Sequence, residues 1–348
     1  MFQAILRVII LTDIAILRFP ENYYSELAIS FLPYLIGITL LWMIISFIKL
    51  RKYLKKTNIF NGPTVKGGTK GGFVSSSRMR WALLVAFGIL FIIHSNAFNS
   101  FYNYKPKSAI SNLWSNNQTI KVLYWNIYKL NEDYSGIQTT IENTNPDLIL
   151  FVEFSENHYE HLKDFLQKNY PYINSTTWSK SFIGSMVFSK YKIENRADDF
   201  PQGRRRYAYF SLQPKDWPEQ YFYLVHTSSP DSYAHFDMRN TQLTDFINDF
   251  QSHQRWYRAD TDKVFVVGDF NISPRSSYYK DFEEWLGSWF IDATREFPTL
   301  FTRKFFQLPI FRAHIDHLRT NDINTIQDIK TVKIPGSDHK WLVFTVNS

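Results

Sequence analysis

The chain has 348 residues, a net charge of +7, 18% aromatic residues and no cysteine. The lack of cysteine excludes a disulfide framework, a thiolate metal site and a cysteine nucleophile. Residues 1–98 carry +8, from eleven Lys and Arg against three acids, so residues 99–348 carry −1 and lack the overall positive charge typical of a non-specific nucleic-acid binder.

Three apolar segments in the N-terminal part are candidates to cross a membrane. Residues 27–48 contain no charge over 22 positions, which is long enough to span a bilayer core, and residues 81–98 form a second candidate. Residues 2–19 are also apolar but contain two Arg and one Asp. Because charges are costly at the bilayer centre, this first segment is either a third span or a helix lying in the interface.

The loop between the two uncharged spans sets the predicted orientation. Residues 49–80 carry nine Lys and Arg and no acid, and they are rich in Gly and Ser. The positive-inside rule places this loop in the cytoplasm. We therefore expect a multi-pass protein of the cytoplasmic membrane, in which residues 99–348 lie on the extracytoplasmic side.

The remaining residues predict a linker followed by an α/β domain. Residues 99–119 are rich in Asn and Ser and are typical of a linker. From residue 120 to 348, seven short apolar segments predict strands: TIKVLYWNI, DLILFVEF, IGSMVFS, YAYFSLQ, QYFYLVHT, KVFVVGDF and KWLVFTV. Between them, ENHYEHLKDFLQKN and FDMRNTQLTDFINDFQSHQ show helical periodicity.

Several of these predicted strands end on a polar residue. The residues at or near strand ends are Asn126, Glu153, His226, Asp269, Asn271, Asp316, Asp338 and His339. Ends of buried strands commonly carry the sites of α/β proteins, because the sheet fixes the side chains there. Carboxylate and amide oxygens suit a hard cation such as Mg²⁺, and histidines beside carboxylates suit acid–base chemistry. This set, with no Ser or Cys nucleophile required, indicates a metal-activated water attacking a phosphate.

The order of these motifs carries a family resemblance. WNI (125–127), VEF (152–154), VHTSSP (225–230), GDFN (268–271), IDHL (315–318) and SDH (337–339) follow one another along the chain. Together they resemble the endonuclease/exonuclease/phosphatase family, over roughly residues 120–348. The HTSSP form and the preceding apolar segments are most similar to a membrane-tethered bacterial branch. The resemblance implies a four-layer α/β sandwich of two mixed sheets flanked by helices, and Mg²⁺-dependent hydrolysis of a phosphoester, with Mn²⁺ as the alternative cation.

The resemblance also implies a role for each residue. It implies that the metal is held mainly by Glu153, together with Asn126 and Asp338. Asp269 would orient or deprotonate the attacking water, and Asn271 would hold the phosphate or position Asp269. His339, oriented by Asp316, would be the base or a phosphate-binding cation.

His226 would stabilise the phosphate or assist the leaving group. In several family members an acid pairs with the corresponding histidine. No motif in residues 175–200 identifies that acid, although Glu194 is available. The protonation state of His226 therefore stays open at this point.

Other choices also stay open. The general base is either Asp269 or the His339–Asp316 pair. The substrate is a nucleic acid, a phospholipid or a small phosphodiester. The second functional hypothesis is a non-catalytic, membrane-tethered scaffold protein on a hydrolase fold.

Two sets of arginines also have two interpretations each. The run Arg204–Arg206 suggests a surface charge cluster or a phosphate contact, and Arg239 suggests either a core position or the site mouth.

Overall fold

The structure is a computed structural model of the chain. It describes residues 22–30, 45, 48, 119–174, 184–197, 206–214, 217–254, 257–258, 261–274, 276–287, 290–296, 303–304, 312–333 and 336–347. The predicted spans and the basic loop lie almost wholly outside these residues. Among the helices that the structure describes, none has the length and apolar character needed to cross a membrane. Helix α2 (Tyr23–Ser30) belongs to the same compact unit as residues 106–348.

The first sheet contains six strands in the order β13-β14-β1-β2-β4-β3. Their bounds are β13 (Ile326–Lys333), β14 (Lys340–Asn347), β1 (Thr119–Asn126), β2 (Leu148–Phe154), β4 (Gly184–Ser189) and β3 (Tyr172–Ile173). β1 and β2 run parallel, whereas the other neighbours are antiparallel. The sheet is therefore mixed, as the resemblance implied.

The second sheet also has six strands, in the order β5-β6-β7-β8-β12-β9. They are β5 (Ile193–Ala197), β6 (Tyr207–Leu212), β7 (Gln220–His226), β8 (Lys263–Asp269), β12 (Asp316–Thr320) and β9 (Ile291–Asp292). Only β7 and β8 pair in parallel. β10 (Arg303–Lys304) and β11 (Arg312–Ala313) form a separate two-stranded ladder.

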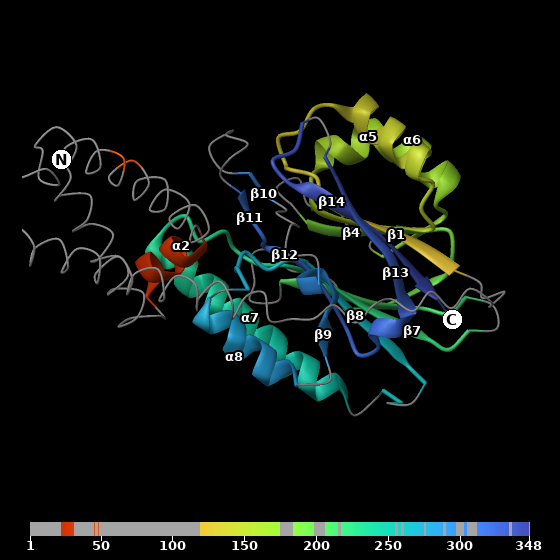
Figure 1. Ribbon diagram of the computed structural model, residues 1–348. Helices are drawn as coiled ribbons and strands as arrows, with labels where there is room; N and C mark the ends of the chain where they lie inside the picture. The colour runs from red at the N-terminus through yellow and green to blue at the C-terminus, as the bar shows by residue number, and fades with distance from the viewer. Residues whose placement is uncertain are drawn as a thin grey trace, which may run out of the picture. The chain divides into compact units, whose positions relative to one another are not determined.

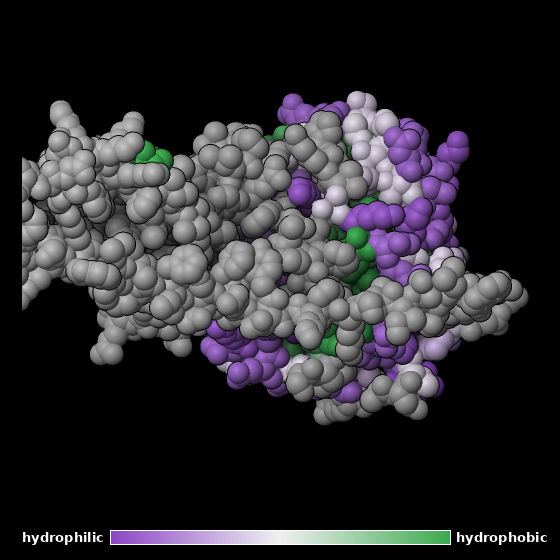
Figure 2. All heavy atoms as spheres, viewed as in Figure 1, coloured by the Kyte–Doolittle hydropathy of each residue, from purple (hydrophilic) through white to green (hydrophobic). Residues whose placement is uncertain are grey.

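Helices cover the outer face of each sheet (Figure 1). α5 (Tyr134–Thr144) and α6 (Glu156–Asn169) pack on the first sheet, and α7 (Tyr233–Gln254) and α8 (Ser277–Leu286) pack on the second. Two short 3₁₀ helices are η1 (Ala293–Glu296) and η2 (Ile323–Thr325). The outward surfaces of the helical layers are mainly hydrophilic (Figure 2). The predicted four-layer sandwich is confirmed.

Strand β8 is buried on both faces, which explains the uninterrupted apolar run Val264–Val267 in its sequence. Val264 and Val266 pack toward α7 and α8, whereas Phe265 and Val267 pack into the core between the two sheets. Alternate residues of a strand point to opposite faces, so an uninterrupted apolar run fills both neighbouring layers. The sheet end that this strand forms is therefore rigidly placed.

Gly268 is required where β8 passes close to β7. A Cβ atom at this position would lie 1.9 Å from the carbonyl oxygen of Val225, and the residue has φ +154°. We expect Gly268→Ala to lower the free energy of unfolding by about 3 kcal/mol or more, because neither backbone can move without breaking the ladder. Urea unfolding measures this change, with Ser135→Ala on the exposed side of α5 as the control. A loss no larger than that of the control would contradict the close packing.

A buried polar cluster lies between α8, β9 and β12. Asp292 accepts hydrogen bonds from the Tyr279 hydroxyl, from the backbone N–H of Thr294 at 2.9 Å and from His317 Nδ1 at 3.2 Å. Burial acts to raise the pKa of Asp292, but His317 and Arg319 outweigh it and hold the pKa well below its usual range. The ionised carboxylate therefore stabilises the fold.

The depressed pKa of Asp292 predicts a pH-dependent loss of stability. The ionised carboxylate contributes fully to the free energy of unfolding above about 3.9, the pKa of an aspartate in the unfolded chain. Below that pH its contribution declines by about 1.4 kcal/mol per pH unit. The stability difference between the wild-type chain and Asp292→Asn should thus shrink as the pH falls from about 5 toward 3. Urea unfolding across this range tests it, with exposed Asp164→Asn as the control. A difference that does not change with pH would show that Asp292 is not ionised in the fold.

Candidate active site

Six chain segments converge where the strands of both sheets end. Asp269 pairs in register with His226 across the parallel β7–β8 ladder and with Asp316 across the antiparallel β8–β12 ladder. These three residues therefore form one row across the second sheet. Asn126 at the end of β1 reaches this row from the first sheet, because its Nδ2 donates to Asp269 Oδ2 at 3.0 Å.

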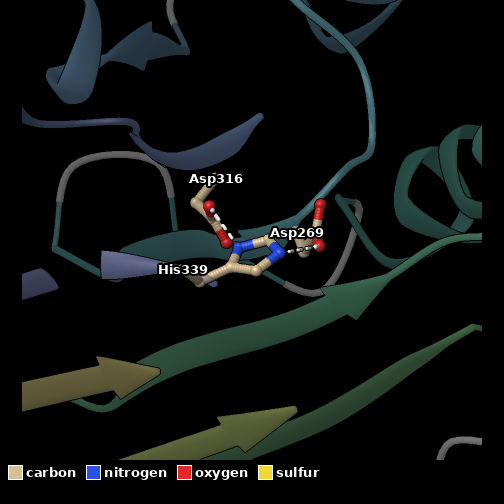
Figure 3. A group of neighbouring side chains, drawn as sticks. All are labelled: Asp269, Asp316 and His339. Carbon is tan, nitrogen blue, oxygen red and sulfur yellow. Dashed lines mark hydrogen bonds and ion pairs between the residues drawn. The ribbon is translucent and has the colours of Figure 1, made fainter. Parts of the chain in front are cut away.

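His339 lies between two carboxylates (Figure 3). Its Nδ1 lies 2.9 Å from Asp316 Oδ2, and its Nε2 lies 3.6 Å from Asp269 Oδ2. All three side chains are buried. Burial disfavours the charged ring, but Asp316 and Asp269 outweigh this effect and raise the pKa of His339 to about 9. The ring is therefore held as an imidazolium at neutral pH.

Asp269 is a buried carboxylate that lies close to a second one, that of Asp316. Burial and the nearby Asp316 raise its pKa to about 7, against the lowering effect of His339 and Arg303. Its Oδ1 accepts a hydrogen bond from the backbone N–H of Asn271 at 2.9 Å. Since His339 already carries a proton, Asp269 is the stronger candidate for accepting one.

Glu153 and Asn126 form the neighbouring, oxygen-rich part of the site. The β2–β4 pairing is irregular between Phe151 and Phe154, and Glu153 adopts φ +57° there, which turns its side chain away from the regular alternation. Its carboxylate accepts from Asn126 Nδ2 at 3.1 Å and from the Lys129 N–H at 3.1 Å. Burial opposes ionisation, whereas the Lys129 N–H, the His339 cation and the Asn126 amide favour it, and the pKa of Glu153 is lowered.

His226, at the end of β7, lies between Glu153 on its Nε2 side and Arg206 on its Nδ1 side. Its Nε2 lies 3.7 Å from Glu153 Oε1, and its Nδ1 lies 3.4 Å from Arg206 Nη2. Burial and the positive charge of Arg206 lower the pKa of His226 to about 3. Because a guanidinium only donates, Nδ1 accepts and the proton of the neutral ring resides on Nε2, toward Glu153. Glu194, which the sequence left available, instead pairs with Arg196.

The loop that carries Asn271 is fixed from several sides. Asn271 has φ +50°, and its Nδ2 donates to the carbonyl oxygen of Thr227 at 2.9 Å. Two residues on the buried face of α7 hold the site loops: Arg239 Nη1 donates to the Asn271 carbonyl at 3.0 Å, and Gln242 accepts from the Ser228 N–H at 2.8 Å. Arg239 therefore occupies a core position directly behind the site.

Two residues at the site, Tyr124 and Arg303, were not proposed from the sequence, and Arg206 was named there only as part of the basic run Arg204–Arg206. The Tyr124 hydroxyl donates to Asp316 Oδ1 at 2.6 Å, and Arg206 contacts His226. Arg303, at the start of β10, approaches Ser229 Oγ at 3.3 Å and Asn271 Oδ1 at 3.4 Å. Tyr124 had a signal in the sequence, since it lies two positions before Asn126 and so on the same strand face, whereas Arg303 had none.

Asp338 is placed differently from the other proposed metal ligands. Its Oδ2 lies 3.3 Å from Arg303 Nε, and its side chain is only partly buried. Among the described contacts, none joins it to Asn126 or Glu153. Its role as a metal ligand stays a prediction.

The chemistry of these residues fits a divalent cation. Asp269, Asp316 and His339 offer atoms that lie within 4.8 Å of one another. Both ring nitrogens of His339 already face carboxylates, however, so the Glu153 carboxylate is the better candidate to hold a cation. Asn126 directs its Nδ2 toward that carboxylate, while its Oδ1 accepts from the Tyr128 N–H at 3.1 Å.

Comparison with known proteins places this arrangement in a family. A family model described as "Endonuclease/Exonuclease/phosphatase family" matches residues 123–339. No curated protein sequence matches the chain. Truncated TDP2 of Caenorhabditis elegans is similar in structure, with 17% identity, a TM-score of 0.52, and coverage of 66% of this chain and 98% of that one.

D. rerio TDP2 in complex with a single-strand DNA product is also similar, with 16% identity, a TM-score of 0.52, and coverage of 66% of this chain and 100% of that one. At these identities the likeness shows the shared fold. The family assignment rests on the sequence match, which extends over more than half of the chain and spans all the site segments described above. The chain therefore belongs to the endonuclease/exonuclease/phosphatase family of metal-dependent phosphoester hydrolases.

Proposed function

We propose that this protein is a membrane-anchored, Mg²⁺-dependent phosphodiester hydrolase whose catalytic domain faces the extracytoplasmic side. The feature that supports the chemistry most directly is the buried His339 imidazolium between Asp316 and Asp269, beside the Glu153 carboxylate that Asn126 Nδ2 holds in place. A fixed cation, a crowded carboxylate and an oxygen-rich set of donors are what hydrolysis of a phosphoester requires.

Asp269 accepts the proton of the attacking water in this proposal. Its raised pKa makes it a better base than an ordinary carboxylate, and Asn126 and the Asn271 N–H hold its two oxygens in place. The alternative, His339 as the base, is disfavoured because the ring already carries its proton at neutral pH. The oxygen of the water then bonds to phosphorus as the ester P–O bond breaks.

His339 and His226 act on the phosphate. The imidazolium of His339, oriented by Asp316, attracts the phosphate oxygens. The neutral His226 presents its Nε2–H, which donates a hydrogen bond to a phosphate oxygen or to the departing oxygen. Glu153 would hold a divalent cation, with Asn126 and Asp338 as the further ligands that the sequence predicts, and such a cation would supply Lewis-acid polarisation of the phosphate.

The membrane anchor is supported by the sequence. The two uncharged segments at 27–48 and 81–98 flank a loop with nine basic residues and no acid. Such an anchor confines the site near a bilayer. It therefore favours a phospholipid or another small phosphodiester over nucleic acid, as does the −1 charge of residues 99–348.

A substrate panel tests this proposal. The full chain is incubated with bis(p-nitrophenyl) phosphate, p-nitrophenyl phosphate, single-stranded DNA and phospholipid vesicles, with Mg²⁺ in each case. DNA belongs in the panel because the similar D. rerio TDP2 structure holds a single-strand DNA product. We expect hydrolysis of the diester at least tenfold faster than that of the monoester. Preference for the monoester would contradict the phosphodiesterase assignment, and no turnover together with no Mg²⁺ binding would favour the scaffold hypothesis.

A further inference from the structure

Helix α2 contributes a buried carboxylate to the catalytic unit. Glu26 Oε1 lies 2.7 Å from Arg239 Nη1, and Glu26 Oε2 accepts from the Ser276 hydroxyl at 2.7 Å. The Glu26 side chain is only 6% exposed and that of Arg239 is fully buried. The ring of Tyr23 also packs edge-on against Phe236 of α7, with ring centroids 5.6 Å apart. Helix α2, red in Figure 1, is thus joined to α7 and to the start of α8 by specific contacts.

Arg239 connects this carboxylate to the active site. The same Nη1 that pairs with Glu26 donates to the carbonyl oxygen of Asn271 at 3.0 Å. The guanidinium is otherwise flanked by the rings of Phe236 and Tyr278, at 5.0 and 5.9 Å from their centroids. Its Nε and Nη2 have no hydrogen-bond partner in the described part of the chain. Glu26 is therefore the counter-charge of a buried cation that touches the catalytic loop.

A buried cation without its counter-charge is costly, and its surroundings rearrange to relieve it. The Arg239 guanidinium could reach water only by leaving the buried face of α7, and this movement would release the Asn271 carbonyl. Asn271 holds the left-handed backbone conformation from which its N–H bonds Asp269. The position of Asp269 thus depends on a residue more than 200 positions earlier in the sequence.

The predicted membrane topology is compatible with this contact. Residues 27–48 and 81–98 flank a cytoplasmic loop, so the residues before the first of these spans and those after the second lie on the same side of the membrane. Glu26 immediately precedes residue 27, at the membrane boundary of this span. The helix that docks on the catalytic domain therefore leads directly into the predicted anchor.

We propose that Glu26 is a positioning residue, and that residues 22–30 complete the catalytic unit by holding Arg239 against the Asn271 loop. This proposal rests on the proposed hydrolase function for its effect on turnover. It implies that a domain lacking residues 22–30 would have a misplaced catalytic loop.

The experiment compares Glu26→Gln, Glu26→Asp and the matched control Glu160→Gln in the full chain. Glu160 lies on the exposed side of α6, where it pairs with Lys163. Hydrolysis of bis(p-nitrophenyl) phosphate gives kcat and KM, and hydrogen–deuterium exchange reports on residues 268–274. We expect Glu26→Gln to lower kcat about 10- to 100-fold with KM changed less than twofold, since a small displacement of a catalytic group has effects of this size.

Glu26→Asp should recover part of the lost kcat, because it restores the charge. Exchange should rise in residues 268–274 of Glu26→Gln and stay unchanged in β2, which lies in the other sheet. Equal exchange and equal kcat in Glu26→Gln and Glu160→Gln would overturn the proposal. A uniform rise in exchange over the whole domain would also overturn it, because Glu26 would then act on global stability alone. If the wild-type chain hydrolyses no substrate, the proposed function fails, while the exchange data still decide the role of Glu26.

Discussion

Asp269→Asn is expected to lower kcat by about 10²- to 10⁴-fold, which is the range that a general base contributes. The amide keeps the shape of the side chain but cannot accept the proton of the attacking water. It also removes one of the two carboxylates that keep His339 protonated. KM should change little, because Asp269 acts on the water rather than on the bound ester. Steady-state hydrolysis of bis(p-nitrophenyl) phosphate measures both constants.

The matched control for this variant is Asp237→Asn, at an exposed position of α7. It makes the same chemical change without touching the site, and its kcat should equal that of the wild-type chain. Thermal unfolding of both variants verifies that they are folded. An Asp269→Asn variant that stays folded and loses less than tenfold in kcat would show that another group is the base.

Asp316 and His339 should behave as one functional unit. We expect His339→Ala and Asp316→Asn each to lower kcat by about 10²- to 10³-fold. The loss has a common cause, because Asp316 keeps the imidazole charged and oriented through the 2.9 Å contact to Nδ1. The double variant should therefore be little worse than His339→Ala alone.

A double-mutant cycle measured with the same diester tests this coupling. Tyr124→Phe provides a milder probe, since it removes only the hydroxyl that donates to Asp316 Oδ1. It should lower kcat by less than either single variant of the pair. If the losses in kcat of His339→Ala and Asp316→Asn multiply in the double variant, the two residues act independently, and Asp316 has a separate role.

The sequence predicted the site wherever a polar residue directly followed a buried strand. The apolar run Val264–Val267 fills two layers of the core, so the sheet fixes Asp269 at its end. The same reasoning placed Asn126, Glu153 and His226 correctly at one end of the sandwich. Apolar runs that end on a polar residue therefore predicted both the strands and most of the residues of the candidate site.

Contacts between distant segments were not predictable in the same way. The partner of His226 proved to be Arg206, which follows from the β6–β7 pairing and not from any local motif. Arg303 reaches the site from a short ladder whose position depends on tertiary packing. Glu26 looks like an ordinary charge before an apolar segment, and only the fold reveals its contact with Arg239.

The most direct test of a divalent-cation site at Glu153 is the metal dependence of diester hydrolysis by the wild-type chain and by Glu153→Gln. Diester hydrolysis is measured after treatment with chelator and then over a titration of Mg²⁺. We expect that chelator abolishes turnover, that Mg²⁺ restores it, and that Glu153→Gln needs at least about tenfold more Mg²⁺ for half-maximal activity. Turnover that persists in chelator, or a variant with the same Mg²⁺ requirement as the wild-type chain, would contradict a divalent-cation site at Glu153.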